Sequence, residues 1–156
     1  MTITDEMVCF SLYSASRAMT QSYRALLEPW GLTYPQYLVL AVLWTEGEQT
    51  IGSLGDVMHL DSGTLSPLVR RLEQADLVVK ARRAADERVV TVSLTEQGRA
   101  LRAEVAPVHR RIAEIAGIQD DDRRYRLIAE LHEITALLQG AAMTPAATSG
   151  GRRKES

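Results

Sequence analysis

Apolar side chains recur every three or four positions in the first part of the chain, which predicts a helix over residues 5–29. The apolar stripe of this helix consists of Val8, Leu12, Ala15, Met19 and Leu26. Gly31 follows it, at the position where many helices end in a glycine. A second helix is predicted after Thr33, which can cap it, with Pro35 in the first turn. Its apolar residues continue almost all round, so we expect this helix to be buried and central.

Two further helices are predicted in close succession. Thr50 opens a short helix with Ile51, Leu54 and Val57 on its apolar side, and a brief connector over residues 60–63 follows. The next helix has a stripe formed by Leu65, Leu68, Val69 and Leu72. Pro67 would cost about 3 kcal/mol in a helix interior. A helix start between Ser62 and Thr64 places Pro67 within or just beyond the first turn, and we prefer that start.

The apolar period then changes from that of a helix to that of a strand. Residues 77–83 and 88–95 are rich in valine, and the AADE sequence between them offers turn residues, so two antiparallel strands are predicted. Thr95 is expected to cap a helix that reaches about Gly117, and residues 120–122 open a last helix. From 140 to 156 the sequence is small, polar and patternless, which predicts a disordered tail.

A short helix, a tight connector, a second helix and a two-stranded hairpin form, in that order, a winged helix-turn-helix. The predicted fold is therefore mainly α with a small β-hairpin wing, and residues 31–94 are the predicted DNA-binding domain. The segment 62–88 holds six basic residues (Arg70, Arg71, Lys80, Arg82, Arg83, Arg88) and four acidic ones (Glu73, Asp76, Asp86, Glu87). Such an excess alone is weak evidence, because most charged stretches are solvated surface.

The second helix of the pair has the chemistry expected of a helix in the major groove. First-turn side chains reach base edges there, and later basic residues meet phosphates. The predicted DNA contacts from this helix are Asp61, Ser62, Thr64 and Ser66 at its start and Arg70 and Arg71 further along. The hairpin adds Arg82, and its tip adds Arg88, which Asp86 can hold in shape for a narrow minor groove. The alternative is that the hairpin arginines only solvate an exposed surface.

Composition adds mainly exclusions. The length suits one domain with a tail, and no apolar run is long enough to cross a bilayer or resembles a signal peptide, so a cytoplasmic protein is expected. A single cysteine, Cys9, excludes a disulfide within the chain. The three histidines (His59, His109, His132) are too scattered to suggest a metal site. We therefore expect that the protein binds no metal and no cofactor and that it is not an enzyme.

The stretch LDSGTLSPLVRRLEQADLVVKARRAADERVVTVSLTEQG resembles the core of MarR-type regulators, and the resemblance extends over roughly residues 8–138. The segments CFSLYSASRAMTQSY and TYPQYLVL are similar to the organic hydroperoxide resistance regulators, of the class with one cysteine. The resemblance implies a homodimer that binds double-stranded operator DNA. Its dimerisation helices would be residues 1–30 and 95–139.

Cys9 has two interpretations. A free cysteine is usually a buried small side chain, and this is the reading without further context. The resemblance instead makes Cys9 a redox sensor whose thiolate receives hydrogen bonds from Tyr23 and Tyr34, with Tyr13 as its neighbour one turn away. Tyr23 follows Cys9 by fourteen residues, which is about 21 Å along one helix. If Tyr23 serves the thiol, it therefore does so from a second chain packed antiparallel, and the alternative role of the tyrosines is that of interface aromatics.

The implied mechanism is oxidation of Cys9 by an organic hydroperoxide to a sulfenic acid. Without a second cysteine, the sulfenate would form a mixed disulfide with a low-molecular-weight thiol or become overoxidised, and the repressor would leave its operator. Two alternatives remain. One is a regulator of the same fold that responds to a small aromatic ligand, with Cys9 incidental. The other is a thiol-dependent peroxidase, against which stand the missing resolving cysteine and the basic hairpin.

Overall fold

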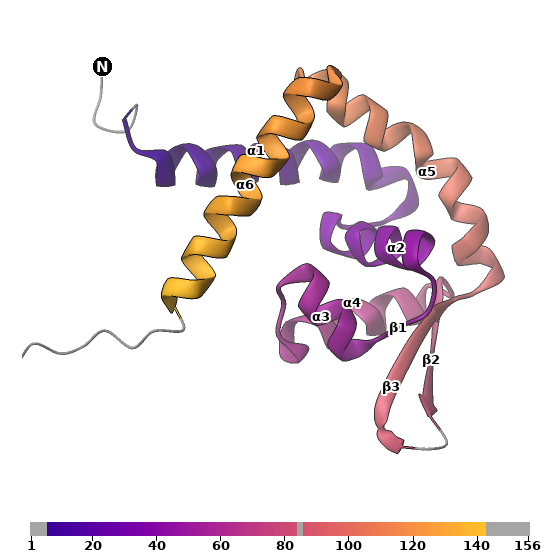
Figure 1. Ribbon diagram of the computed structural model, residues 1–156. Coiled ribbons are helices and arrows are strands. Elements are labelled where there is room, and N and C mark those ends of the chain that lie inside the picture. Colours follow the sequence, from indigo (N-terminus) through magenta and orange to yellow (C-terminus); the bar gives the residue numbers. More distant parts are fainter. Residues whose placement is uncertain (1–5, 84–85, 143–156) are drawn as a thin grey trace, which may run out of the picture. The chain divides into compact units, whose positions relative to one another are not determined.

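The computed structural model describes residues 6–83 and 86–142, without the side chains of 83, 86–88 and 142. Contacts divide the chain into two compact units, residues 1–112 and 113–156. In chain order the elements are α1 (Val8–Leu27), η2 (Glu28–Trp30), α2 (Tyr34–Glu46), β1 (Gln49–Thr50), α3 (Ile51–Met58), α4 (Ser62–Gln74), β2 (Val78–Arg83), β3 (Asp86–Leu94), α5 (Glu96–Ile115) and α6 (Asp121–Ala142). The predicted fold class, mainly α with a hairpin wing, is confirmed (Figure 1).

The predicted helix starts are confirmed by their capping hydrogen bonds. The Thr33 hydroxyl accepts a hydrogen bond from the Gln36 amide, and the Gln36 side chain accepts one from the Thr33 amide, which forms a complete capping box. Thr50 caps α3 through the Ser53 amide. Thr95 caps α5 through the amide of Gly98. These bonds satisfy amides that a helix start leaves without a partner, so short polar residues before apolar stripes mark the starts.

Two helix ends differ from the prediction. We expected the first helix over residues 5–29, whereas α1 ends at Leu27 and the chain tightens into the 3-10 turn η2, which contains Pro29. Gly31 then takes the left-handed conformation with φ 63°. At the other end of the chain, α6 continues through Gly140 to Ala142, where we expected the tail to begin. The rest of the predicted tail, residues 143–156, lies outside the described residues.

The sheet has one strand more than the hairpin that the sequence predicts. Strand order is β1-β3-β2, and β3 pairs antiparallel with both neighbours. The unpredicted strand β1 is only Gln49 and Thr50, which pair with Val92 and Thr91. Strand β2 pairs with β3 from Val78 with Leu94 to Arg82 with Val90, and the register shifts after Arg82. In Figure 1 the hairpin β2–β3 extends away from the helices as a wing.

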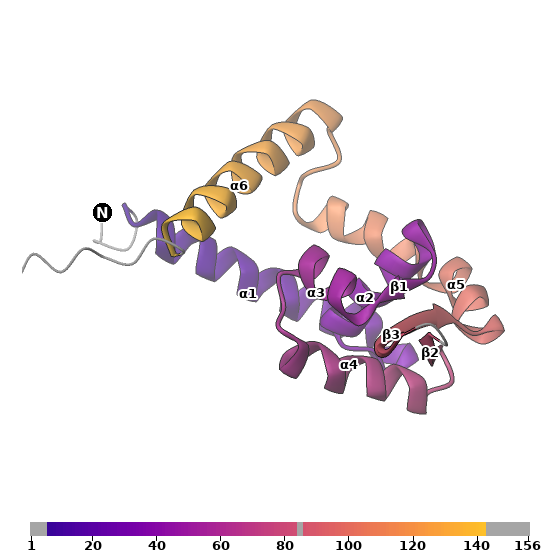
Figure 2. The same ribbon diagram turned by 60° about the horizontal axis from the view of Figure 1, so that its bottom comes forward.

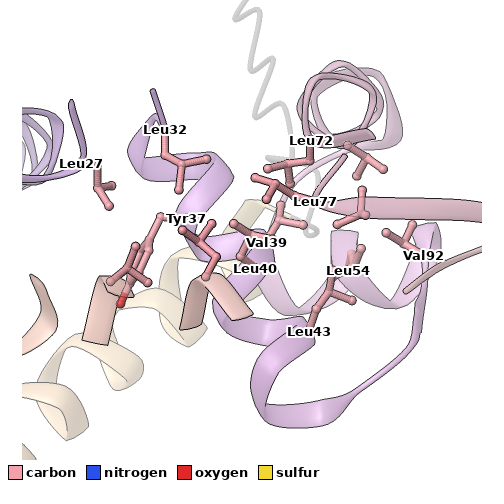
Figure 3. Close-up of a cluster of buried hydrophobic side chains, with 14 of the residues drawn as sticks. Leu27, Leu32, Tyr37, Val39, Leu40, Leu43, Leu54, Leu72, Leu77 and Val92 are labelled. Carbon is pink, nitrogen blue, oxygen red and sulfur yellow. The ribbon is translucent and has the colours of Figure 1, made fainter. Parts of the chain in front are cut away.

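The core of the first unit lies where α2 meets the DNA-binding helices and the base of the hairpin. Leu27 comes from α1, Leu40 and Leu43 from α2, and Leu54 and Leu72 from α3 and α4, and all five are fully or almost fully buried (Figure 3). Helix α2 supplies five of its thirteen residues to the interior, which confirms that it is the buried central helix. Burial of each leucine side chain contributes roughly 1.5–3 kcal/mol. The core therefore fixes the positions of α3 and α4.

Helix α5 joins this unit through a close backbone contact. A Cβ placed on Gly98 would overlap the carbonyl oxygen of Leu77, at the start of the hairpin. The Thr95 hydroxyl donates to the Asp76 carbonyl at 2.6 Å, and the Trp44 indole donates to the Gly98 carbonyl at 2.8 Å. The end of α4, the start of β2 and the start of α5 are thus held together.

Candidate DNA-binding surface and thiol site

The first turn of α4 is organised by Asp61. Its carboxylate accepts hydrogen bonds from both the amide of Thr64, at 2.8 Å, and the Thr64 hydroxyl, at 3.1 Å. These hydrogen bonds hold the pKa of the Asp61 carboxyl below its usual range. Both oxygens and the Thr64 hydroxyl are therefore engaged within the helix start. Asp61 and Thr64 stand at the predicted position, but in this structure they shape the turn.

The other predicted contacts of α4 present free surface. Ser62, Ser66 and Arg70 are exposed and follow one another at intervals of four residues, so they share one face of the helix. Arg71 is exposed as well, while Leu65, Val69 and Leu72 are buried. Pro67 is the sixth residue of α4 and is exposed, and the helix start at Ser62 lies in the range that we prefer. In Figure 2 α4 runs along the edge of the unit, beside the hairpin.

The hairpin contributes one described arginine to this surface. Arg82 is exposed in β2 and lines a groove of about 730 Å³ between α4 and the hairpin. Ser66 and Glu73 line the same groove from α4. The predicted contact pair Asp86 and Arg88 lies in β3, but these two side chains are outside the described residues.

An ion pair that the sequence did not predict crosses from α4 to the hairpin. The Lys80 ammonium lies 2.8 Å from a Glu73 carboxylate oxygen, and the Lys80 amide donates to the other oxygen at 3.4 Å. The hydrogen bond from the Lys80 side chain holds the pKa of the Glu73 carboxyl below its usual range. The two residues are seven apart across a turn, so no helical or strand spacing connects them.

Cys9 is exposed in the first turn of α1. In the single chain, Cys9 is therefore not a packed small residue. Its neighbours are also uncovered, since Met7, Val8, Phe10 and Tyr13 are exposed apolar or aromatic side chains. The Tyr13 hydroxyl accepts a hydrogen bond from Arg17 at 3.0 Å, one turn further from Cys9. The phenolic proton of Tyr13 remains available as a donor.

Tyr23 and Tyr34, the two predicted partners of the thiol, do lie together. Their rings stack with centroids 4.1 Å apart and an angle of 18° between planes. Tyr37, which the sequence analysis did not single out, joins them with its centroid 5.5 Å from that of Tyr23. Its position one turn after Tyr34 in α2 was the available signal. The cluster is at the carboxyl end of α1, whereas Cys9 is at its amino end.

Burial controls the protonation of this tyrosine cluster. Desolvation raises the pKa of Tyr23 far above its usual value, and the neighbouring Tyr34 and Tyr37 raise it further. Desolvation likewise raises the pKa values of Tyr34 and Tyr37. A phenol with its ordinary pKa is already protonated at neutral pH, and the raised pKa values extend this to more alkaline pH, so these hydroxyls can donate hydrogen bonds to an anion.

The described part of the chain offers neither a metal site nor a membrane span. No group of three or more histidine, cysteine, aspartate or glutamate side chains there could hold a metal ion. None of the described helices is both long enough and apolar enough to span a membrane.

Known proteins place this arrangement in a family. The model of the SarA/Rot transcriptional regulators matches residues 21–105. The organic hydroperoxide resistance transcriptional regulator of Bacillus subtilis is 37% identical over 83% of this chain and 92% of its own length. The regulator TtmR of Methylorubrum extorquens is 39% identical over 93% of this chain and 75% of its own.

Solved structures of similar proteins indicate the same family as these relatives. Reduced AbfR bound to DNA is 35% identical and superposes with a TM-score of 0.72 over 84% of this chain and 91% of AbfR, a protein of Staphylococcus epidermidis. AbfR is also known overoxidised and bound to DNA, and in a disulfide form. The predicted resemblance is confirmed, and the chain belongs to the MarR-like SarA/Rot family of transcriptional regulators.

Proposed function

We propose that the protein is a DNA-binding repressor that releases its operator when an organic hydroperoxide oxidises Cys9. The observation that carries the proposal is the arrangement along α1. An exposed thiol lies at one end of the helix, and a stacked tyrosine pair, with Tyr23 buried and Tyr34 half-buried, lies at the other. The similarity to a hydroperoxide resistance regulator supports the chemical identity of the signal.

The DNA contact is formed by α4 and the hairpin. Ser62 and Ser66 offer short hydrogen-bonding groups to base edges, and Arg70, Arg71 and Arg82 offer charge to phosphates. The DNA-bound structures of AbfR support DNA binding by a chain of this fold. Asp86 and Arg88 remain proposed wing contacts, which the sequence pattern alone supports.

The thiol site is completed by a second copy of the chain. Cys9 and Tyr23 are about 21 Å apart along α1 and cannot meet within it. Two antiparallel α1 helices bring Tyr23 and Tyr34 of one protomer to Cys9 of the other. Such a dimer also covers the exposed Val8 and Phe10, since apolar patches of this kind mark interaction surfaces.

The proposed chemistry has two steps. The Cys9 thiolate attacks the outer peroxide oxygen, the O–O bond breaks, and the alkoxide leaves and is protonated to the alcohol, which leaves a sulfenic acid on Cys9. A small thiol then attacks the sulfenic sulfur and water leaves, which gives a mixed disulfide. An adduct in a packed interface costs about 1–3 kcal/mol through overpacking. A hundredfold loss of DNA affinity needs about 2.7 kcal/mol, so the adduct is sufficient in size.

The test is a DNA-binding titration with a duplex that the reduced protein selects from a random library. Cumene hydroperoxide plus a small thiol should release the wild type, with the adduct mass on Cys9, and should leave Cys9→Ser bound. Equal release of both proteins would refute the cysteine mechanism. A further titration with hydroperoxide and no added thiol distinguishes release caused by the mixed disulfide from release caused by overoxidation. The distinction matters because overoxidised AbfR is itself bound to DNA.

A further inference from the structure

The carboxylate of Glu73 joins two elements that DNA must meet together. Glu73 is in the last turn of α4, and Lys80 is in the middle of β2. One oxygen of the carboxylate meets the Lys80 ammonium at 2.8 Å, and the other accepts from the Lys80 amide at 3.4 Å. The carboxylate thus contacts both the side chain and the main chain of one strand residue. A contact to the main chain constrains the strand itself, which a contact to the long lysine side chain alone would not.

Strand β2 is at the edge of the sheet, because the strand order is β1-β3-β2. An edge strand presents amides that no neighbouring strand satisfies. Glu73 supplies an acceptor for one of these, at Lys80. The hairpin is therefore attached to α4 on the open edge of β2.

The groove of about 730 Å³ lies between α4 and the hairpin, and both Glu73 and Lys80 line it. Ser66 and Val69 line it from α4, and Ala81 and Arg82 line it from β2. The Glu73–Lys80 pair thus connects the two sides of this groove. We expect a change at this pair to alter the separation of α4 and the hairpin.

We propose that Glu73 is a positioning residue for DNA recognition, which sets the hairpin against α4 so that both elements fit one operator. The carboxylate also holds the Lys80 ammonium, so that this charge does not serve as an unspecific phosphate contact. The inference rests on the proposed DNA binding and adds a residue to it that contacts no DNA itself.

The pair is not expected to act mainly through stability. The Glu73 and Lys80 side chains are 36% and 34% exposed, respectively. Ion pairs near the surface contribute about 0–1 kcal/mol, because water and salt screen them. The consequence of its loss should therefore appear in the choice of DNA rather than in folding.

The test compares Glu73→Gln with Glu46→Gln, which removes the same charge from an exposed residue at the end of α2. Affinities are measured for the duplex selected by the wild type and for a scrambled duplex of equal composition, over a range of salt concentrations. For Glu73→Gln we expect about a tenfold loss of preference for the selected duplex, as large as the effect of a mismatched base pair. On the scrambled duplex, the slope of log affinity against log salt should steepen by about 0.9, the value for one more phosphate contact. Glu46→Gln should leave both unchanged.

The reversed pair, Glu73→Lys with Lys80→Glu, should recover part of the preference that Glu73→Lys alone loses. An unchanged preference in Glu73→Gln would overturn the inference. Equal losses on both duplexes with a lowered Tm would also overturn it, because they would indicate a purely structural role. If the wild type selects no duplex at all, the proposed function fails instead, which is a separate outcome.

Discussion

Tyr23 and Tyr34 stack face to face with ring centroids 4.1 Å apart, and both belong to a cluster that desolvation keeps protonated. The stack joins the carboxyl end of α1 to the first residue of α2. The two hydroxyls that we assign to the thiol therefore form one unit, which a second protomer can offer to Cys9 as a whole. This relationship allows the interprotomer assignment to be tested directly.

Mixed dimers should show whether the tyrosines act across the interface. In a Tyr23→Phe homodimer, alkylation of Cys9 should slow by about tenfold or more, because a hydrogen bond to a charged group is worth roughly 1.5–3 kcal/mol. Pairing that chain with a Cys9→Ser chain restores Tyr23 opposite the one remaining thiol. The alkylation rate should then return to the wild-type value. A rate that stays slow in the mixed dimer would mean that Tyr23 does not act across the interface.

Substitution of Gly98 by alanine should destabilise the first unit strongly. The added Cβ would overlap the Leu77 carbonyl oxygen, which is backbone and cannot move away as a side chain could. We expect a loss of about 3 kcal/mol or more in the free energy of unfolding, measured by urea denaturation. Gly140→Ala is the matched control in α6, because nothing lies within 4 Å of its added Cβ. It should be neutral or stabilise by about 0.5–1 kcal/mol. Similar effects at both positions would contradict the close contact at Gly98.

Two substitutions of Asp61 should distinguish its role as the cap of α4 from the effect of its negative charge. Asp61→Ala removes the acceptor of the Thr64 amide and should lower the free energy of unfolding. Asp61→Asn keeps an acceptor and removes a negative charge from the proposed DNA surface, so it should retain most of the stability and bind DNA more tightly. Thermal unfolding and a DNA titration give the two quantities. Equal unfolding free energies for the two variants would show that the cap contributes nothing.

The tyrosine cluster should make the protein sensitive to alkaline pH. Burial raises the pKa of Tyr23 above its value in the unfolded chain, near 10.0. A raised pKa means that the stabilising contribution is complete below pH 10 and is lost as the pH rises further, since the unfolded state loses its proton first. We expect Tm to fall as the pH rises above about 10, and to fall less in Tyr23→Phe. An identical pH profile of Tm for the two proteins would argue against this cause.

Local physics explains why so many elements could be predicted from the sequence. Thr33, Thr50 and Thr95 each precede an apolar stripe, and each caps a helix because the first amides of any helix need an acceptor. The hairpin follows from two valine-rich runs around a turn. By contrast, β1 has two residues and pairs with Val92 and Thr91 more than forty positions away. A strand of two residues is too short to show an alternating pattern of apolar and polar residues in the sequence.

The candidate site, too, is partly predictable from the sequence and partly decided by the tertiary structure. The residue types and their order, from Cys9 and the tyrosines to the serines and arginines of α4, are a property of the sequence. The family resemblance that they carry predicts a regulator with a redox-sensing thiol. Only the tertiary structure decided that Cys9 is exposed, that Tyr23 and Tyr34 stack, and that Asp61 binds Thr64. It alone decided that Glu73 holds Lys80 and that Gly98 meets Leu77. Caps and periods arise from neighbours along the chain, whereas these contacts depend on burial and on packing between elements, which no spacing along the sequence specifies.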